Sequence, residues 1–398
     1  MFDFFIKPIL GVLYLFLVIS PIFIFVFLLY KLKNKFFDLK YWEFKLKQNH
    51  TMYKIIIPED FGKGPRAMEI ILSTIWNTSK EGNWYSKRWS GGSRPEFSLE
   101  IISIGGKVNF YIRTRDAFEK VIESAFKANY PSIKLEKVDD YAKEFSYKKD
   151  ANGGLFGFEA KLTKADPIPI KTYKKFGLDK DKLNAEDIID PVSYFVQTLS
   201  NISEGENMWL QFVIRGQKKD YTKKKRCFWK EYFEIGSDET HDWNPIAQKE
   251  IEKIKKDLVK TEFQTDREKK LIDEIIENIS KPSFWVGTRI IYFAKKGKFD
   301  GKNINPILMF FQPLKSEEYN SFSYSFHTGF DYKWQDIKGK KTEKLRKDIF
   351  NDFKRRKYFS AGSKEMIIRF APGKRYRTFV LSTEELATVF HPIIKAKK

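Results

Sequence analysis

The sequence predicts an α+β protein preceded by a single N-terminal membrane helix, and three observations lead to this fold class. Hydrophobic residues make up 42% of the 398 residues and aromatic residues 17%, which is enough apolar surface to build folded cores. One long apolar run lies within the first 30 residues. After it, strand-like and helix-like patterns alternate along the chain, as expected of an α+β fold.

The apolar run extends from Pro8 to Tyr30, and none of its 23 residues is charged. At about 1.5 Å per residue, a helix of this length crosses a hydrocarbon core of roughly 30 Å. A cleaved signal peptide is disfavoured, because the run stays apolar up to Lys31 and has no small-residue cleavage site. A re-entrant hairpin that turns at Ser20-Pro21 is a further alternative. We expect residues 1–40 to be a transmembrane anchor with a basic flank.

Lysines around this run predict its orientation. Only Lys7 precedes it, whereas Lys31, Lys33, Lys35 and Lys40 follow it. Because positively charged flanks stay on the cytoplasmic side, we expect a single-pass protein of the cell (inner) membrane with its C-terminal region in the cytoplasm.

Residues 41–160 are expected to form a first α+β module. The pattern is strand, helix, strand, strand, helix, strand, with Gly105-Gly106 as a tight turn between the two central strands. This order is that of the split βαβ, ferredoxin-like arrangement. The elements lie at Met52–Pro58, Ala67–Trp76, Phe97–Ile104, Val108–Arg113, Arg115–Asn129 and Ile133–Val138.

A second ferredoxin-like module with basic insertions is expected at residues 206–398. The proline-containing segment 161–205 is expected to connect the two modules. The second module is predicted to contain strands at Trp209–Arg215, Phe284–Ala294 and Glu365–Phe370, helices at Ile246–Lys260 and Glu268–Ile279, and a helical or extended segment at Ile307–Leu314.

The chain carries a formal charge of +21, from 73 Lys and Arg against 52 Asp and Glu. Such an excess favours anionic partners, either nucleic-acid phosphates or acidic lipid headgroups. We assign about half of it to the codon bias of an AT-rich genome, because Lys, Ile, Phe, Asn and Tyr are all abundant. Cys227 is the only cysteine, so a disulfide framework is excluded.

The sequence shows no pattern typical of an enzyme, and we expect no catalytic residue, cofactor or metal. Gly105-Gly106-Lys107 resembles the end of a phosphate-binding loop, but Val108 stands where Ser or Thr must hold magnesium. Asp139-Asp140 and Glu317-Glu318 are carboxylate pairs of the kind usually found as solvated charges. The histidines, which have no metal-ligand spacing, are His50, His241, His327 and His391.

Basic runs with aromatic neighbours provide the only candidate binding residues. Lysine and arginine neutralise phosphates, and aromatic rings stack on unpaired bases. Solvated loops on a basic protein are the alternative interpretation. The candidate phosphate or headgroup contacts are Lys218, Lys219, Lys223, Lys224, Lys225, Arg226 and Trp229.

Two consecutive segments carry a resemblance to a known family. They are FSLEIISIGGKVNFYIRT at Phe97–Thr114 and FEKVIESAFKANYP at Phe118–Pro131. Both resemble the N-terminal region of membrane-bound ATPases related to type IV secretion and conjugation, in the HerA/FtsK-like superfamily with TraD- and TraG-type relatives. Supporting segments, which extend the resemblance over nearly the whole chain after the anchor, are Asp166–Tyr173, Glu206–Arg215 and Leu381–His391.

In such ATPases this region precedes a nucleotide-binding motor domain. The present sequence departs from that pattern, because it reaches Lys398 without a Walker A or Walker B motif. We therefore expect no motor activity, and the resemblance supplies no catalytic or binding residues.

Taken together, these observations predict a non-catalytic membrane component of a type IV secretion or conjugation-like system that translocates DNA or protein. Its role would be to dock or scaffold a separate Walker-type ATPase, and a second copy of the chain is a further possible partner. One alternative is a membrane-tethered nucleic-acid-binding module, with DNA as partner. Another is a split motor whose ATPase is encoded by the next gene.

Overall fold

The computed structural model divides the chain into two compact units, which are considered separately. The first comprises Met1–Lys47, Lys80–Ser93 and Ser360–Lys364, and the second comprises Gln48–Ser79, Arg94–Phe359 and Glu365–Lys398. The structure describes residues 2–58, 64–77, 89–148, 152–179, 190–217, 243–260, 266–330, 332–359 and 377–393.

The first unit is dominated by helix α1, Phe2–Lys47. Near its end, the rings of Phe36 and Phe37 pack edge-to-face on Trp89, with centroids 5.7 and 6.2 Å away. Where the structure describes side chains, it contains no helix long and apolar enough to cross a membrane. Most side chains of residues 8–30 lie outside that description, so the membrane span stays a prediction.

The second unit is built on one nine-stranded sheet in which every paired strand is antiparallel. The α+β class is therefore confirmed. The strand order is β4-β1-β3-β2-β6-β7-β5-β8, and β9 also pairs with β7. The strands are β1 His50–Ile56, β2 Glu96–Ile104, β3 Lys107–Arg115, β4 Lys134–Val138, β5 Asn152–Leu162, β6 Glu206–Gly216, β7 Ser283–Lys295, β8 Phe322–His327 and β9 Phe379–Ser382.

The first four strands and two helices match the sequence prediction. Helix α2, Pro65–Ile75, joins β1 to β2, and helix α4, Glu119–Asn129, joins β3 to β4. Strand β1 lies between β3 and β4. Each helical connection therefore passes over one intervening strand. Gly105 and Gly106, with φ of 57° and 82°, form the tight turn between β2 and β3, as predicted.

The second half of the sheet repeats this connectivity. Helix α5, Pro191–Ser200, joins β5 to β6, and helix α9, Ile304–Leu308, lies between β7 and β8. The order β8-β5-β7-β6 matches β4-β1-β3-β2 but runs in the reverse direction along the sheet. The two halves meet where β2 pairs with β6, and Glu100 faces Gln211 at the centre of that pairing.

The segment 161–205, expected as a connector, contains the end of β5 and all of α5, and both belong to this second half. The domain boundaries at residues 160 and 205 stay a prediction, because both halves share one sheet. The helices predicted before β7 are observed as α7, Trp243–Lys260, and α8, Asp266–Ser280. The strand predicted at residues 365–370 lies outside the described residues.

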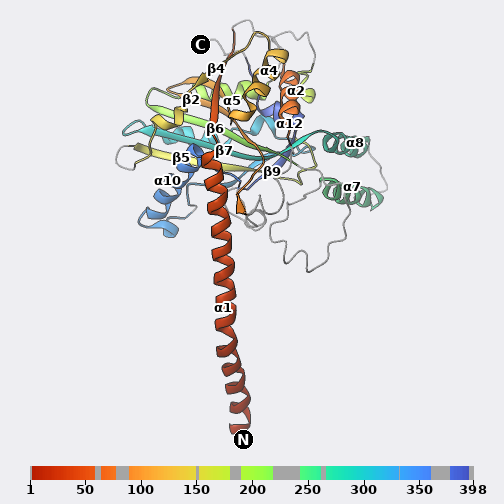
Figure 1. Cartoon of the computed structure of the whole chain (residues 1–398). Helices are drawn as coiled ribbons and strands as arrows, with labels where there is room; N and C mark the ends of the chain where they lie inside the picture. The colour runs from red at the N-terminus through yellow and green to blue at the C-terminus, as the bar shows by residue number, and fades with distance from the viewer. Residues whose placement is uncertain are drawn as a thin grey trace. The chain divides into compact units, whose positions relative to one another are not determined.

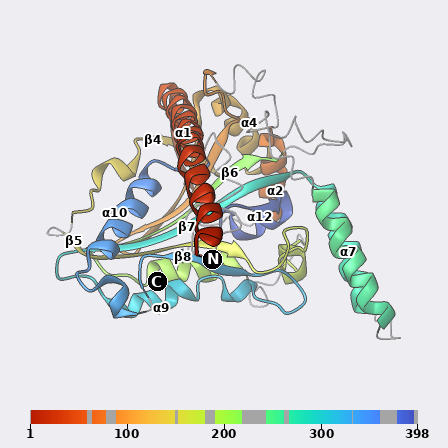
Figure 2. The same ribbon diagram turned by 90° about the horizontal axis from the view of Figure 1, so that it is seen from below.

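Helices cover both faces of the sheet. One face carries α2, α4, α5 and α12, the last at Thr383–Val389 (Figure 1). The opposite face carries α10, Lys340–Lys354, which lies over the strands in the view from below (Figure 2). Under α10, Trp209 packs against Phe293, Phe350 and Phe353 at centroid distances of 4.7, 6.2 and 5.3 Å. The helix-covered strands thus bury a core on each side.

A row of polar side chains crosses the sheet on the α10 face. Glu100, Gln211, Arg289 and Glu159 are successive cross-strand partners on β2, β6, β7 and β5. Arg289 donates to one carboxylate oxygen of Glu159 from Nε at 3.1 Å and from Nη2 at 2.7 Å, and both side chains are fully buried. Removing charged and polar side chains from water costs free energy, so each buried charge in this row requires a partner.

Arg356, just after α10, supplies the partner of Glu100. Its Nε and Nη2 donate to the Glu100 carboxylate at 2.9 and 3.2 Å, and its guanidinium also pairs with Asp140. Tyr141 and Gln211 donate to the same carboxylate at 2.6 and 3.0 Å. Burial opposes ionisation of Glu100, but the charge and hydrogen bonds of Arg356 hold its pKa at about 2.

Arg356 also has a φ of 49°, a left-handed conformation that is unfavourable for a residue with a Cβ atom. The ion pair of Arg356 with Glu100 compensates for this conformation. It holds the end of α10 against strands β2 and β6, which join the two halves of the sheet.

Replacing Arg356 by Met should lower the free energy of unfolding by about 3 to 5 kcal/mol, because Glu100 would remain buried without its cation. Chemical denaturation of the full chain measures this loss. The double variant Glu100→Gln/Arg356→Met should lose less than the sum of the two single variants. Arg355→Met, at the exposed neighbour, is the matched control and should change stability little. Equal losses for Arg355→Met and Arg356→Met would contradict the assigned role.

Candidate functional site

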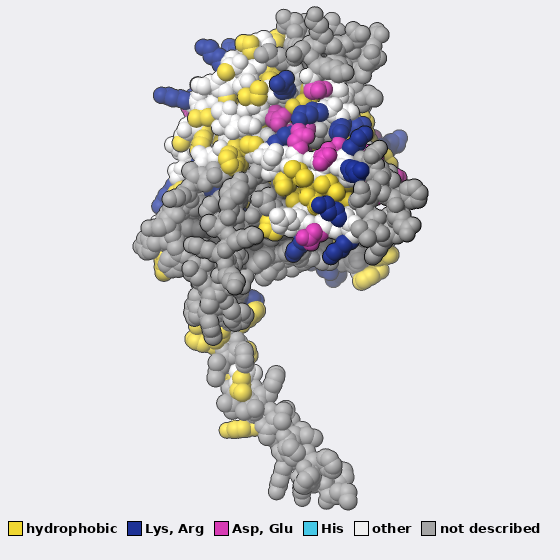
Figure 3. Space-filling view, turned by 90° about the vertical axis from the view of Figure 1, so that its right-hand side faces the viewer, with side chains coloured by type: hydrophobic (Ala, Val, Ile, Leu, Met, Phe, Trp, Pro, Cys, Tyr) yellow, Lys and Arg dark blue, Asp and Glu magenta, His cyan; other side chains and the backbone are white. Residues whose placement is uncertain are grey.

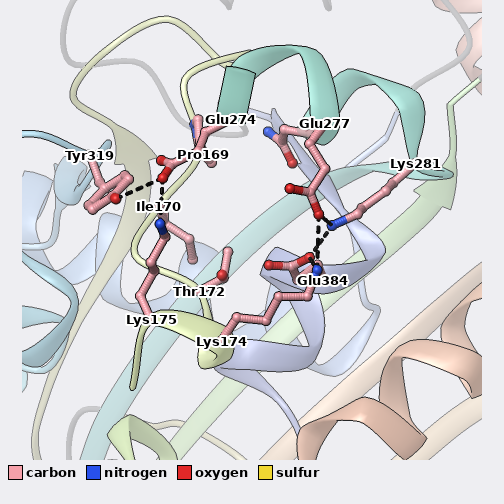
Figure 4. A pocket seen from close by; sticks show the side chains of 11 residues that line it. Pro169, Ile170, Thr172, Lys174, Lys175, Glu274, Glu277, Lys281, Tyr319 and Glu384 are labelled. Atoms are coloured by element: carbon pink, nitrogen blue, oxygen red, sulfur yellow. Dashed lines mark hydrogen bonds and ion pairs between the residues drawn. The ribbon is translucent and has the colours of Figure 1, made fainter. Parts of the chain in front are cut away.

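A cavity of about 240 Å³ with several charged side chains in its wall lies between α8, the segment before and within the 3₁₀ helix η3, and α12 (Figure 4). Helix η3 is Tyr173–Phe176. This α8 pocket is lined by Pro169, Ile170, Thr172, Lys174, Lys175, Glu274, Glu277, Asn278, Lys281, Tyr319 and Glu384.

The amphipathic pattern of α8 directs charged residues into the pocket. Ile275 on α8 is buried with Ile168 and Ala247, the last of which lies on α7. Glu274 and Asn278 therefore fall beside that apolar stripe, and Glu277 lies farther round the helix on the same side; all three line the cavity. The pairing of α7 with α8 thus sets the carboxylates of α8 opposite η3 and α12.

Four side chains form an alternating charge cluster at one end of the pocket. Lys174 Nζ lies 2.8 Å from Glu384 and 3.0 Å from Glu277. Lys281 Nζ lies 2.8 Å from Glu277 and also pairs with Glu384. Figure 4 shows these residues converging from α8 and the residue that follows it, from η3 and from α12. Two positive and two negative charges cancel, so the cluster is neutral and each member has opposite-charge partners.

The cluster stabilises the charged forms of its members. Hydrogen bonds from Lys281 and Lys174 lower the pKa of Glu277 to about 2. Burial opposes the charged forms of Lys174 and Glu384, but their mutual hydrogen bonds prevail. They raise the pKa of Lys174 and lower that of Glu384. Stability from the lowered Glu277 pKa is present above its ordinary value of 4.5 and is lost as pH falls toward 2.

A second ion pair lies at the other end of the pocket. Lys175 pairs with Glu274 at 2.5 Å, and Tyr319 Oη donates to Glu274 at 3.1 Å. These three residues also line an adjoining cavity of about 490 Å³. Figure 3 views the molecule from the side of α7 and α8 and shows basic and acidic side chains interspersed on that face. The face that carries α7 and α8 is therefore mixed in charge.

Glu385, next to Glu384, is fully buried behind the pocket. Its carboxylate accepts hydrogen bonds from the backbone N–H of Ile170 at 2.9 Å and of Ser382 at 2.8 Å. With Ser382 it forms the capping box of α12. Burial nevertheless raises the pKa of Glu385 to about 7.

The geometry of the pocket is that of a set of ion pairs that join α8 to η3 and α12. Within the described residues, no group of three or more His, Cys, Asp or Glu side chains is placed to hold a metal ion. The three lysines that line the pocket, Lys174, Lys175 and Lys281, each engage a carboxylate. The arrangement fixes α8, and with it α7, to η3 and α12.

The binding residues predicted from the sequence, Lys218, Lys219, Lys223, Lys224, Lys225, Arg226 and Trp229, lie outside the described residues. They precede α7, so the chain leads from that basic run into the α7–α8 pair. The charge cluster of the pocket was not predicted from the sequence. One local signal points to it, because Glu277 and Lys281 have the (i, i+4) spacing of a helical ion pair. Ser382 and Glu385 have the spacing of a capping box, which places the start of α12 but not the cluster.

Comparisons with protein-family models, curated proteins and solved structures give no significant match. The resemblance carried by Phe97–Thr114 and the other segments therefore stays a prediction. The functional argument rests on the residues of the chain and their geometry.

Replacing Glu385 by Gln should flatten the dependence of stability on pH. A carboxyl whose pKa is about 7 in the folded state and near 4.5 in the unfolded state favours folding below pH 4.5. That contribution is lost as pH rises to 7. Melting temperatures of the full chain between pH 5 and pH 8 should therefore fall more for the natural protein than for Glu385→Gln. The difference would correspond to on the order of 2 to 3 kcal/mol.

The Gln variant should also carry a constant cost, because its amide nitrogen cannot accept one of the two backbone hydrogen bonds. The pH slope, rather than the absolute stability, is therefore the test. Glu384→Gln serves as the control, since the pKa of Glu384 is shifted in the opposite direction. Parallel pH profiles for the natural protein and Glu385→Gln would refute the assignment.

Proposed function

We propose that this chain is a non-catalytic membrane component of a type IV secretion or conjugation-like translocation system, and that it docks or scaffolds a separate Walker-type ATPase. The main support is the continuous sheet, in which two similar halves join edge to edge through β2 and β6. Two buried ion pairs, Glu159 with Arg289 and Glu100 with Arg356, hold elements of this sheet together. This suits a scaffold better than a reaction centre.

Each half of the sheet is further proposed to be a ferredoxin-like module. The support is the element order β-α-β-β-α-β, which occurs from β1 to β4 and again from β5 to β8. In the second module, the counterpart of the Gly105-Gly106 turn is the long connection from β6 to β7 that contains α7 and α8. The basic run at residues 218–226 lies in that connection.

The proposed anchor is the apolar run Pro8–Tyr30 within α1. The lysines that follow it, from Lys31 to Lys40, favour a cytoplasmic location of the second unit. A cytoplasmic ATPase would then meet the scaffold on the same side of the membrane.

The purified full chain should neither hydrolyse ATP nor gain thermal stability from Mg-ATP. The reason is that Gly105-Gly106-Lys107 belongs to a β-hairpin, and the Gly105 N–H already donates to the carbonyl of Glu206 at 2.9 Å. A phosphate-binding loop instead needs free backbone N–H groups at the start of a helix. Scanning calorimetry with and without Mg-ATP measures the stabilisation.

A nucleotide-induced rise in melting temperature that Lys107→Ala abolishes would show that the hairpin is a nucleotide site. A rise that survives Lys107→Ala, together with hydrolysis, would overturn the non-catalytic proposal. The variant keeps the turn, because Gly105 and Gly106, which have positive φ, are unchanged.

The alternative function, nucleic-acid binding, is favoured by the basic run and its aromatic neighbour. If Lys223, Lys224 and Lys225 contact phosphates, the full chain should bind DNA with a salt-dependent affinity. Replacing the three by Gln should reduce the slope of log affinity against log salt by about 2 to 3 units. Trp229→Ala should weaken single-strand binding by about 1 to 3 kcal/mol if its indole stacks on a base.

The matched control for charge is a triple Gln variant on α7, at the exposed residues Lys249, Lys253 and Lys256. Equal slopes for both triple variants would show a general effect of net charge. Anionic vesicles separate DNA from lipid as the ligand of the basic run. DNA binding that depends on Lys223, Lys224 and Lys225 would favour the alternative function over the scaffold.

A further inference from the structure

An aromatic and basic surface lies between the edge strand β8 and helix α10. Tyr332, Trp334 and Ile337 expose 60%, 71% and 85% of their surface, although all three have large apolar side chains. They lie in and around the 3₁₀ helix η6, Lys333–Asp336. We call the three residues, with the exposed lysines that follow them, the η6 surface. Its lysines are Lys338, Lys340, Lys341, Lys344 and Lys347.

The protein holds these apolar side chains outward in a defined geometry. The rings of Tyr332 and Trp334 are stacked, with centroids 6.1 Å apart and planes at 20°. The Asp336 carboxylate accepts hydrogen bonds from the N–H groups of Lys341 at 3.1 Å and Thr342 at 2.7 Å. This fixes the turn to the first residues of α10. Since water contact with such side chains is unfavourable, their fixed exposure indicates a partner.

The charge of the η6 surface is strongly positive. Residues 334–347 contain six basic residues and two acidic ones. Both acidic side chains are engaged within the fold: Asp336 caps α10, and Glu343 accepts from Tyr147 at 3.3 Å and lies 3.9 Å from Arg346. Lys340, Lys344 and Lys347 follow the spacing of one helical face. That face turns away from the buried Ile349, Phe350 and Phe353.

We propose that the η6 surface docks on an anionic lipid surface. Trp and Tyr are the side chains that settle at the headgroup level of a bilayer, and lysines beside them meet lipid phosphates. Ile337 then enters the acyl boundary, as apolar residues of interfacial segments do. The proposal rests on the proposed function to the extent that the N-terminal helix keeps this surface near a bilayer.

Two observations favour lipid over single-stranded nucleic acid. Ile337, the most exposed of the three, has no aromatic face on which a base could stack. Tyr332 and Trp334 already stack on each other, so each has one ring face occupied. A bilayer interface accepts both features, because it needs apolar volume and lysine charge rather than open ring faces.

The test places a spin label on the full chain in lipid nanodiscs. Cys227→Ser removes the only native thiol, and Ile337→Cys introduces the labelling site at an exposed position. In discs containing phosphatidylglycerol, the label should lose several-fold accessibility to a polar nickel chelate and gain accessibility to oxygen. Discs of phosphatidylcholine alone should give a smaller change, because the lysines then lack anionic headgroups.

Lys127→Cys, labelled in the same background, is the matched control, since Lys127 is exposed on α4 over the opposite face of the sheet. Its label should stay accessible to the nickel chelate in all discs. In the Ile337→Cys protein, changing Lys340, Lys344 and Lys347 to Gln should restore most of the accessibility to the chelate.

The two proposals fail in different ways. A chain that does not co-elute with any nanodisc overturns the membrane anchor; the label at residue 337 is then tested with phosphatidylglycerol vesicles. A chain that co-elutes while its label at residue 337 remains as accessible as that at residue 127 overturns lipid docking and leaves the anchor standing. Protection of residue 337 by an oligonucleotide, with no effect of phosphatidylglycerol, also overturns it, in favour of nucleic acid.

Discussion

The pairing of β2 with β6 is the contact on which the rest of the second unit depends. It runs without interruption from Glu96 opposite Arg215 to Ile104 opposite Asn207. Without it, each half of the sheet would present a long apolar edge strand, which promotes aggregation. Burying the polar residues at the centre of this β2–β6 pairing costs free energy. Arg356 offsets that cost, because it neutralises Glu100 beneath α10. Sheet continuity and helix placement are thus coupled through one buried ion pair.

The pairing of β2 with β6 also determines where the rest of the second half of the sheet lies. With β6 fixed against β2, strand β7 pairs along the whole of β6 and then carries both β5 and β9. Strand β9 leads directly into α12, which supplies Glu384 and Glu385. The connection between β6 and β7 supplies α8, so the α8 pocket forms where the long insertion returns to the sheet. Its charge cluster and the apolar contact of Ile275 with Ile168 together hold the insertion in place.

The charges of the protein serve distinct physical purposes according to their surroundings. Glu159 and Arg289 are paired within the core, where an isolated charge would be strongly unfavourable. Glu277 and Lys281 are partly solvated, and they tie α8 to Lys174 of η3 and to Glu384 of α12. The lysines of the η6 surface face solvent beside exposed aromatic rings. A formal charge of +21 therefore says little by itself, because only position separates a structural cation from one that can meet an anionic partner.

The sequence by itself determined the α+β class and the elements of the first half of the sheet. Apolar spacing located α2 and α4, and the Gly105-Gly106 pair located the β2–β3 turn, because periodicity and glycine conformation are local properties. Strands β6 and β7 and helices α7 and α8 were also predicted from local patterns. Strand β5 was missed, since Gly153, Gly154 and Gly157 and the charged Glu159 weaken its strand pattern. Helix α5 was also missed, because it lies in a proline-containing segment that was expected to be a connector.

Only the tertiary structure decided which charges are paired and which strands are neighbours. Glu100 and Arg356 are separated by 256 positions in the chain, and Lys174 and Glu277 by 103. Nothing in the sequence near either residue indicates such a partner, because a buried ion pair depends on which elements the folded sheet brings together. The exposure of Trp334 and Ile337 is equally a property of the fold. Local sequence specifies the elements, whereas burial and charge pairing arise only when distant elements pack.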